Sequence, residues 1–146
     1  STLHTNDAAS AITRLQDMGL ESYLVSSTVV GIMAQRLVRR ICSACRTEDA
    51  GSAELRDYFG LPAGETFYRG AGCGKCFDTG YKGRAMVGEI IEVTSALREM
   101  ITRKPGAEEI RTLAIREGMT PLTQNALAMA RAGITTLDEV FSVKLE

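Results

Sequence analysis

The chain has 146 residues, of which 45% are hydrophobic and 24% charged, so it can bury the core of an ordinary globular domain and is not a disordered tail. Seventeen basic and eighteen acidic residues leave a net charge of -1, which removes any bulk attraction to nucleic acid or anionic lipid. The longest apolar run, at residues 29–34, is far shorter than the ~20 residues of a membrane span. Because the chain starts at Ser1, with neither methionine nor a signal-peptide pattern, we expect it to be a piece of a longer protein.

The first predicted element is an amphipathic helix over 7–18. Asn6 and Asp7 are typical of a helix start, because a short polar side chain accepts hydrogen bonds from unpaired N–H groups and a carboxylate favours the positive end of the helix dipole. Apolar residues then recur at helical spacing, and Gly19 suits the left-handed residue that ends a helix.

Residues 21–41 carry apolar side chains on nearly all sides, which indicates an element buried by neighbours on several faces. In this interpretation Arg36, Arg39 and Arg40 lie in the last helical turns, where cations favour the negative end of the dipole.

The middle of the chain, residues 42–84, is rich in turns. It holds all four cysteines and more than half of the fourteen glycines, so it cannot rely on a large apolar core. A short helix is expected at 52–59 and a strand at 66–68.

From residue 85 onward one strand and then a cluster of helices are expected. The β-branched residues over 85–93 predict the strand. Helices follow wherever a capping residue opens a run of helical periodicity and Gly or Pro ends it. They are expected over 94–103, over 108–117, from Thr120 and Pro121 to Gly133, and from the capping-box pair Thr136 and Glu139 onward.

All four cysteines stand in two identical C-x-x-C pairs, Cys42 with Cys45 and Cys73 with Cys76. A two-residue spacer lets one tight turn present two thiolates to the same ion, and two such turns complete a tetrahedral shell for zinc. A closed shell of four sulfurs leaves no position for water, so the predicted zinc is structural rather than catalytic. The basic residues that could offset its charge are Arg39, Arg40, Arg46 and Lys75.

Two other uses of the cysteines stay open. Disulfides are disfavoured because nothing marks the chain as secreted. A thioredoxin-like redox pair lacks its βαβ context and would be duplicated without need. The 27 residues between the pairs exceed the usual interval of four-cysteine fingers, which argues against a nucleic-acid finger but not against metal binding.

Four stretches of the chain together resemble one known family. Residues 1–8, STLHTNDA, are similar to the histidine box of the secretion ATPases that drive type II secretion and type IV pilus assembly. The segments AQRLVR at 34–39, TGYKGR at 79–84 and AGITTLDEV at 132–140 are similar to further motifs of that family, in the same order. The chain thus resembles the C-terminal portion of such an ATPase, of the general secretory pathway protein E type, over essentially its whole length.

The resemblance implies an α+β, mostly helical fold in three consecutive parts. Residues 1–41 are expected to be the C-terminal end of a RecA-like α/β ATPase domain, residues 42–84 a four-cysteine zinc-binding subdomain, and residues 85–146 a C-terminal strand with a helical subdomain. It also implies a hexameric parent that uses ATP and Mg in the cytoplasm, peripheral to the inner membrane. The implied partners are the other subunits and the inner-membrane secretion or pilus platform proteins, with no nucleic acid and no direct membrane span.

A phosphate-binding loop is missing from the sequence. Its pattern is G-x-x-x-x-G-K-[ST], whereas Gly74 and Lys75 are followed by Cys76, and Arg69 stands where the first glycine should be. The resemblance implies that the loop lies upstream in the parent, so we do not expect the isolated chain to hydrolyse ATP.

The resemblance suggests three residues near the parent's nucleotide. His4 matches the histidine of the family box and is the catalytic candidate, because an imidazole can hydrogen-bond developing charge on phosphate or orient the attacking water. Arg84 matches the arginine of a Gly-Arg motif, and Arg14 a recurrent arginine of the first helix; both are nucleotide-binding candidates. The simpler alternatives are a surface histidine, a charge neutraliser for the zinc centre and a solvated helix face, respectively.

The match departs from the family after Arg84. Met86 replaces a glycine and Gly88 an aromatic residue, which leaves the pilus and secretion branches unseparated. A different class of function, a free-standing structural zinc ribbon that binds other proteins, is the alternative hypothesis. Nucleic-acid binding is the least favoured, because the chain is slightly acidic and has only eight Phe and Tyr residues for stacking.

Overall fold

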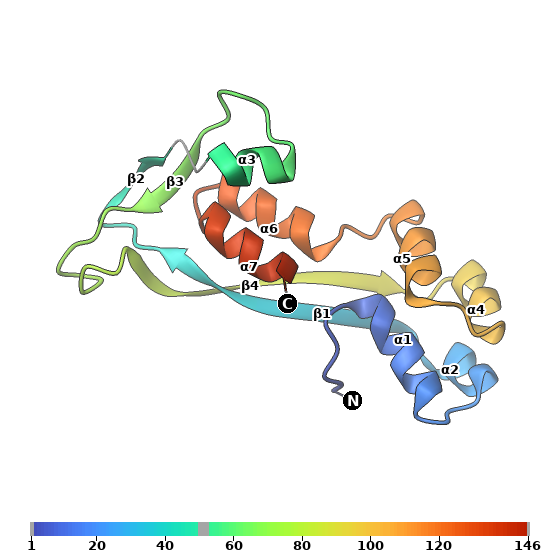
Figure 1. Ribbon diagram of the computed structural model, residues 1–146. Helices are drawn as coiled ribbons and strands as arrows, with labels where there is room; N and C mark the ends of the chain where they lie inside the picture. Colours follow the sequence, from blue (N-terminus) through green and yellow to red (C-terminus); the bar gives the residue numbers. More distant parts are fainter. Residues whose placement is uncertain (1, 50–52, 146) are drawn as a thin grey trace. The chain divides into compact units, whose positions relative to one another are not determined.

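The computed structural model describes residues 2–49 and 53–145, and it shows an α+β chain (Figure 1). Within these residues there are seven helices and two sheets of two strands each. One sheet pairs β1 with β4, and the other pairs β2 with β3. The helices are α1 (Ala8–Asp17), α2 (Ser22–Thr28), α3 (Ala53–Phe59), α4 (Ser95–Thr102), α5 (Ala107–Arg116), α6 (Leu122–Arg131) and α7 (Leu137–Leu145). The strands are β1 (Gly31–Ile41), β2 (Arg46–Asp49), β3 (Phe67–Gly70) and β4 (Tyr81–Glu92).

The chain forms two compact units, each assembled from two stretches of sequence. The first unit combines Ser1–Gln35 with Gly88–Leu122, and the second combines Arg36–Val87 with Thr123–Glu146. The long strands β1 and β4 therefore contribute residues to both units. This division is discontinuous along the chain, whereas the division expected from the sequence has three consecutive segments, whose boundaries stay a prediction.

The core of the first unit is formed by helices α1, α2, α4 and α5 with parts of the long strands. Helices begin where the sequence predicts them, but the residue that caps α1 is Asp7 and not Asn6: the Asp7 carboxylate accepts a 2.7 Å hydrogen bond from the Ser10 N–H. The cap predicted at Thr94 is confirmed, because its hydroxyl accepts a 3.2 Å hydrogen bond from the Leu97 N–H. Gly19 has the expected positive φ of 88° after α1. The buried residues of this core are Ala8, Ala9, Ile12, Val25, Ile91, Val93, Leu97, Ile101, Ile110, Leu113, Ala114 and Met119.

The interpretation of residues 21–41 is corrected by the structure. This stretch divides into the short helix α2 and the strand β1, so Arg36, Arg39 and Arg40 lie on a strand and not in the last turns of a helix. Along β1, exposed and partly buried residues alternate up to Leu37, which is the period of a strand. A segment with apolar residues on every side is compatible with the period of a helix and with that of a strand. Residues 31–41 form a strand because they pair with the distant β4.

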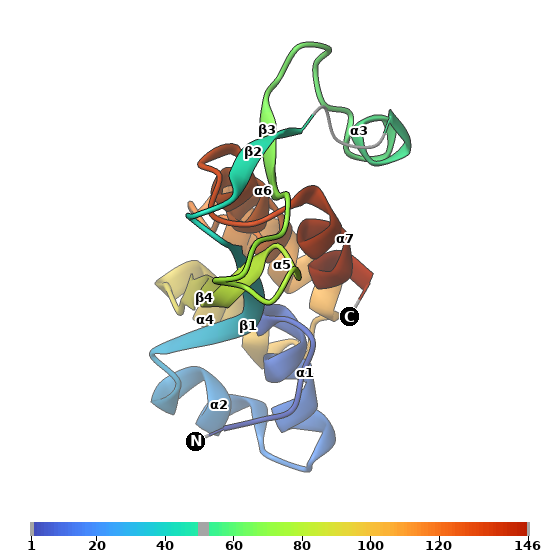
Figure 2. The ribbon, with the colours of Figure 1, turned by 90° about the vertical axis from the view of Figure 1, so that its left-hand side faces the viewer.

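The second unit contains the β2–β3 ribbon and helices α3, α6 and α7. Figure 2 shows β2 and β3 side by side, and they pair antiparallel from Arg46 opposite Gly70 to Asp49 opposite Phe67. The predicted short helix at 52–59 is found as α3, with residue 52 outside the described residues, and the strand predicted at 66–68 is found as β3. The expected C-terminal helices are found as α5, α6 and α7.

Only half of the predicted capping box at α7 forms. The Glu139 N–H donates to the Thr136 hydroxyl at 3.4 Å, but the Glu139 carboxylate binds Arg39 of β1. It accepts the Arg39 backbone N–H at 2.7 Å and the guanidinium Nε and Nη2 at 2.9 and 2.7 Å. This ion pair joins α7 to β1, just ahead of the first cysteine pair.

Candidate metal centre

Two tight turns, each between two strands, carry the cysteines. Cys42 and Cys45 lie between β1 and β2, while Cys73 and Cys76 lie between β3 and β4. Each turn closes by a hydrogen bond within its pair: the Cys45 N–H donates to the Cys42 carbonyl at 3.2 Å, and the Cys76 N–H to the Cys73 carbonyl at 3.1 Å. The C-x-x-C spacing thus folds locally into the turn that places both thiols of a pair on one side.

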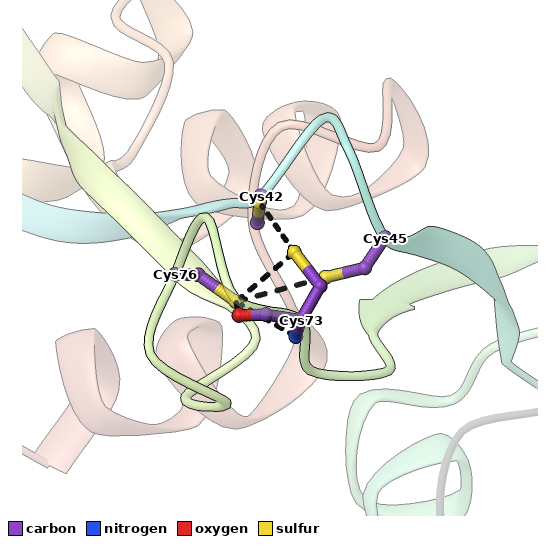
Figure 3. Close-up of side chains that lie close together, drawn as sticks. All are labelled: Cys42, Cys45, Cys73 and Cys76. Atoms are coloured by element: carbon purple, nitrogen blue, oxygen red, sulfur yellow. Dashed lines mark hydrogen bonds between the residues drawn. The ribbon is translucent and has the colours of Figure 1, made fainter.

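The four thiols converge on one point (Figure 3). The Sγ atoms all lie within 4.8 Å of one another. Three of their separations are 3.9 Å for Cys42 to Cys73, 3.8 Å for Cys45 to Cys76 and 3.7 Å for Cys73 to Cys76. A tetrahedron with metal–sulfur bonds of ~2.3 Å has edges of roughly 3.8 Å, so the cluster has the size of a tetrathiolate zinc shell. The predicted convergence of the four cysteines is confirmed, and their donor set and spacing fit zinc.

All four cysteines are free thiols in this structure, so they are not joined in disulfides. Cys42 and Cys76 are buried, and Cys45 and Cys73 are half-buried. A cluster of soft sulfur donors in tetrahedral array is typical of zinc or iron–sulfur sites. Because the four sulfurs occupy every corner, a metal held there has a structural role and no position for a reacting water.

The thiols differ in how readily they ionise. Burial raises the pKa of Cys45 to about 12, and hydrogen bonds with the neighbouring thiols add to the rise. Burial also opposes ionisation of Cys76, but hydrogen bonds from the backbone N–H groups of Cys73 and Gly80 lower the pKa of Cys76 to about 7. The Cys73 N–H lies 3.3 Å from the Cys76 Sγ. Crowded thiols cannot all ionise alone, and a divalent cation supplies the charge that permits four thiolates.

Backbone hydrogen bonds tie the two turns to each other. The Cys42 N–H donates to the Gly80 carbonyl, and the Ala71 N–H donates to the Cys45 carbonyl, both at 2.9 Å. Each bond joins a residue of one cysteine turn to a residue flanking the other. The geometry of the cluster therefore comes from the pairing of distant loops as well as from each turn.

Two of the basic residues expected to offset the zinc charge have other contacts. Arg39 binds Glu139 and stacks 4.1 Å from the ring centre of Tyr81. Arg46 lies 5.1 Å from the ring centre of Tyr68. Arg40 and Lys75 are exposed. Arg39 and Arg46 thus take part in contacts within the second unit, and the electrostatic role expected for the four residues stays a prediction.

The nucleotide-proximal candidates lie in different units. His4 is exposed in the segment before α1, and Arg14 is exposed on α1, both in the first unit. Arg84 is exposed on β4 in the second unit. Their roles stay predictions.

Sequence reasoning missed a buried carboxylate, Glu89 on β4, which is only 2% exposed. Its Oε1 accepts the Ala8 N–H at the start of α1, and its Oε2 accepts the Leu122 N–H at the start of α6, both at 2.8 Å. One signal could have found it: Val87, Glu89 and Ile91 share the inward face of a strand with period two, and a carboxylate on that face needs partners.

The α+β fold and the four converging thiols define a protein with a candidate metal centre, and comparison with known proteins gives its family. The family described as type II/IV secretion system protein matches residues 1–142. The chain belongs to this family. None of the helices among the described residues is both long enough and apolar enough to cross a membrane.

The chain is similar to both branches of this family. It is 43% identical, over all of its length, to the type IV pilus assembly ATPase PilB of Thermus thermophilus and covers 17% of that protein. It is 41% identical, again over all of its length, to the type II secretion system ATPase E of Vibrio cholerae and covers 29% of it. It is 40% identical over 96% of its length to PilB of Myxococcus xanthus and covers 26% of it. The chain thus spans less than a third of each of these relatives.

Proposed function

We propose that this chain is the C-terminal, zinc-binding part of a hexameric ATPase that powers type II protein secretion or type IV pilus assembly. The observation that carries the proposal is the match over the whole chain to ATPases of both systems, with four thiols converging where the two C-x-x-C pairs predict a metal. In this proposal residues 1–41 are the end of a RecA-like ATPase domain, residues 42–84 the zinc subdomain and residues 85–146 the C-terminal strand and helices.

The metal stabilises the second unit and takes no part in ATP chemistry. Cys42, Cys45, Cys73 and Cys76 would hold zinc, which supplies the positive charge that keeps four thiolates together. The β2–β3 ribbon between the two cysteine turns is only four residues long per strand, and such a ribbon is marginal alone. Metal binding is thus a large part of the folding free energy of this region.

His4, Arg84 and Arg14 act at the nucleotide in the assembled parent, which also binds ATP and Mg. His4 lies in a segment without regular structure, ahead of α1, and its side chain is exposed. The exposed guanidinium of Arg84 offers fixed donors to phosphate or base, and the exposed guanidinium of Arg14 would serve a neighbouring subunit. The parent acts in the cytoplasm, peripheral to the inner membrane, on secretion or pilus platform proteins.

Metal analysis and kinetics of the full-length protein test the proposal. Prepared under reducing conditions without chelators, the protein should contain about one zinc per chain. It should hydrolyse ATP with Mg, and His4→Ala or Arg84→Ala should lower kcat by about 100-fold or more without changing the zinc content. Thr2→Ala and Arg103→Ala are matched controls at exposed positions. Absence of zinc contradicts the metal assignment, and unchanged kcat in both variants contradicts the assignment of His4 and Arg84.

A further inference from the structure

Phe77, which directly follows Cys76, is the most exposed large apolar side chain among the described residues, at 88%. Its backbone has a positive φ of 52°, and that of the next residue, Asp78, is 59°. Glycine or asparagine adopts this conformation at little cost, whereas a bulky residue is strained there. The backbone conformation of Phe77 is therefore unfavourable for a bulky residue, and the exposure of its ring to water is unfavourable as well. Residues with strained backbones are frequent at functional sites.

The surroundings of Phe77 are basic. Between residues 69 and 84 the chain carries four basic residues, Arg69, Lys75, Lys82 and Arg84, against Asp78 alone. Lys75 and Lys82, on either side of Phe77 in sequence, are both exposed. We call Phe77 with these two lysines the knuckle tip. Its chemistry fits an apolar pocket bordered by carboxylates.

The first unit contains a pocket of about 200 Å³ that is lined by apolar and polar groups. Buried Ile91, Ala114 and Met119 form its apolar part. Glu92 and Glu117, both exposed, add two carboxylates, and the Thr94 hydroxyl donates to the Glu117 carboxylate at 2.7 Å. An aliphatic cavity of ~150 Å³ is large enough to bind benzene, so this acidic pocket can take a phenyl ring.

We propose that Phe77 of one copy of this chain inserts into the acidic pocket of a second copy, with Lys75 and Lys82 facing Glu92 and Glu117. Charge complementarity between the two surfaces selects a second copy as the occupant. Because tip and pocket are different surfaces, the contact is heterologous, and its repetition builds a ring or an open filament. This contact would be one of those that hold together the hexamer proposed above. Only the closure of the contacts into a ring rests on the proposed function.

Self-association of the full 146-residue chain, loaded with zinc, tests this contact by sedimentation velocity over a range of concentrations. Phe77→Gly should weaken association by at least about tenfold, because a buried aromatic anchor is lost. The same variant should keep its zinc and its thermal stability, since glycine relieves the positive φ. Phe77→Asn repeats the test with a residue that also tolerates this conformation. Tyr23→Ala, at a 64% exposed aromatic residue on α2, is the matched control.

Charge reversal and mixing test the direction of the contact. Lys75→Glu and Glu92→Lys should each weaken association, and the two together in one chain should restore it, because every contact then pairs opposite charges again. Mixing Phe77→Gly with Glu92→Lys should give dimers that neither forms alone, since one intact tip still meets one intact pocket.

Three results would overturn the contact: a zinc-loaded wild-type chain that stays monomeric, Phe77→Gly that associates like wild type, or Phe77→Gly that loses its metal. Zinc content and ATP hydrolysis of the full-length protein are measured separately. Failure of the contact is therefore distinguished from failure of the proposed function.

Discussion

The backbones of Gly70 and Gly80 approach so closely that a Cβ added to Gly70 would lie 1.9 Å from the carbonyl oxygen of Gly80. A Cβ on Gly80 would lie 2.6 Å from the carbonyl oxygen of Gly70, and Gly80 also has a positive φ of 77°. The Gly80 carbonyl accepts the Cys42 N–H at 2.9 Å. This crossing of two glycines therefore positions a ligand of the first cysteine turn against the end of the second.

We expect Gly70→Ala to disrupt the metal centre. The added methyl group would overlap the backbone of Gly80. Because this backbone cannot move away as a flexible side chain could, the two loops must separate. The predicted result is loss of bound zinc and destabilisation by at least about 2 kcal/mol, measured by metal analysis and denaturant unfolding. Gly74→Ala is the matched control, because nothing lies within 4 Å of its added Cβ although Gly74 is adjacent to Cys73. Equal effects of the two variants would contradict this explanation.

Glu89 should be needed for the stability of the first unit. In Glu89→Gln the side chain keeps its shape, but its NH₂ group faces one of the two backbone N–H groups that the carboxylate accepts, those of Ala8 and Leu122. A buried donor without a partner costs about 1–3 kcal/mol, which denaturant unfolding should show as a lower free energy of unfolding. Amide exchange at Ala8 or Leu122 should accelerate as well. Glu99→Gln, at an exposed position on α4, should change neither quantity.

We expect Arg39→Ala and Glu139→Ala to lower the stability of the protein by different amounts. In Arg39→Ala the backbone N–H of residue 39 still donates to the Glu139 carboxylate, whereas Glu139→Ala removes all three hydrogen bonds. The Arg39 side chain is 56% exposed, so its loss should cost only about 0.5–1 kcal/mol. The Glu139 side chain is 11% exposed, and its loss should cost about 1.5–3 kcal/mol. Thermal unfolding of both variants measures the difference, and equal losses would show that the backbone contact contributes nothing.

Local signals predicted those elements whose cause is local. Asp7 and Thr94 cap α1 and α4 because a side-chain acceptor three residues before a backbone donor needs no distant partner. The cysteine turns were equally predictable, since a C-x-x-C spacing folds into one tight turn. The convergence of the two pairs followed from the number of thiolates that a zinc ion requires.

Local patterning fails where distant residues decide the structure. It does not identify β1 as a strand, because the partner strand β4 begins forty residues after β1 ends. Spacing alone puts Glu139 in a capping box, but a guanidinium 100 residues away along the chain competes for its carboxylate. The two hydrogen bonds of Glu89 likewise span 81 and 33 residues. Such contacts depend on the topology of the whole chain, and the spacing of residues within one segment carries no information about it.

Removing the metal should unfold the cysteine region before the rest of the chain. The cysteine turns belong to the second unit, whereas the apolar core formed by α1, α2, α4 and α5 belongs to the first. Chelation under reducing conditions, or Cys73→Ser, should therefore abolish hydrogen-exchange protection of the Cys45, Ala71 and Cys76 amides, which close and join the two turns. Protection of Ile110 and other core amides of the first unit should persist. Ser43→Ala, within the first turn but without a ligand atom, is the control. If the turn amides kept their protection without metal, the hydrogen bonds of the turns would suffice to fold them and the metal would have no structural role.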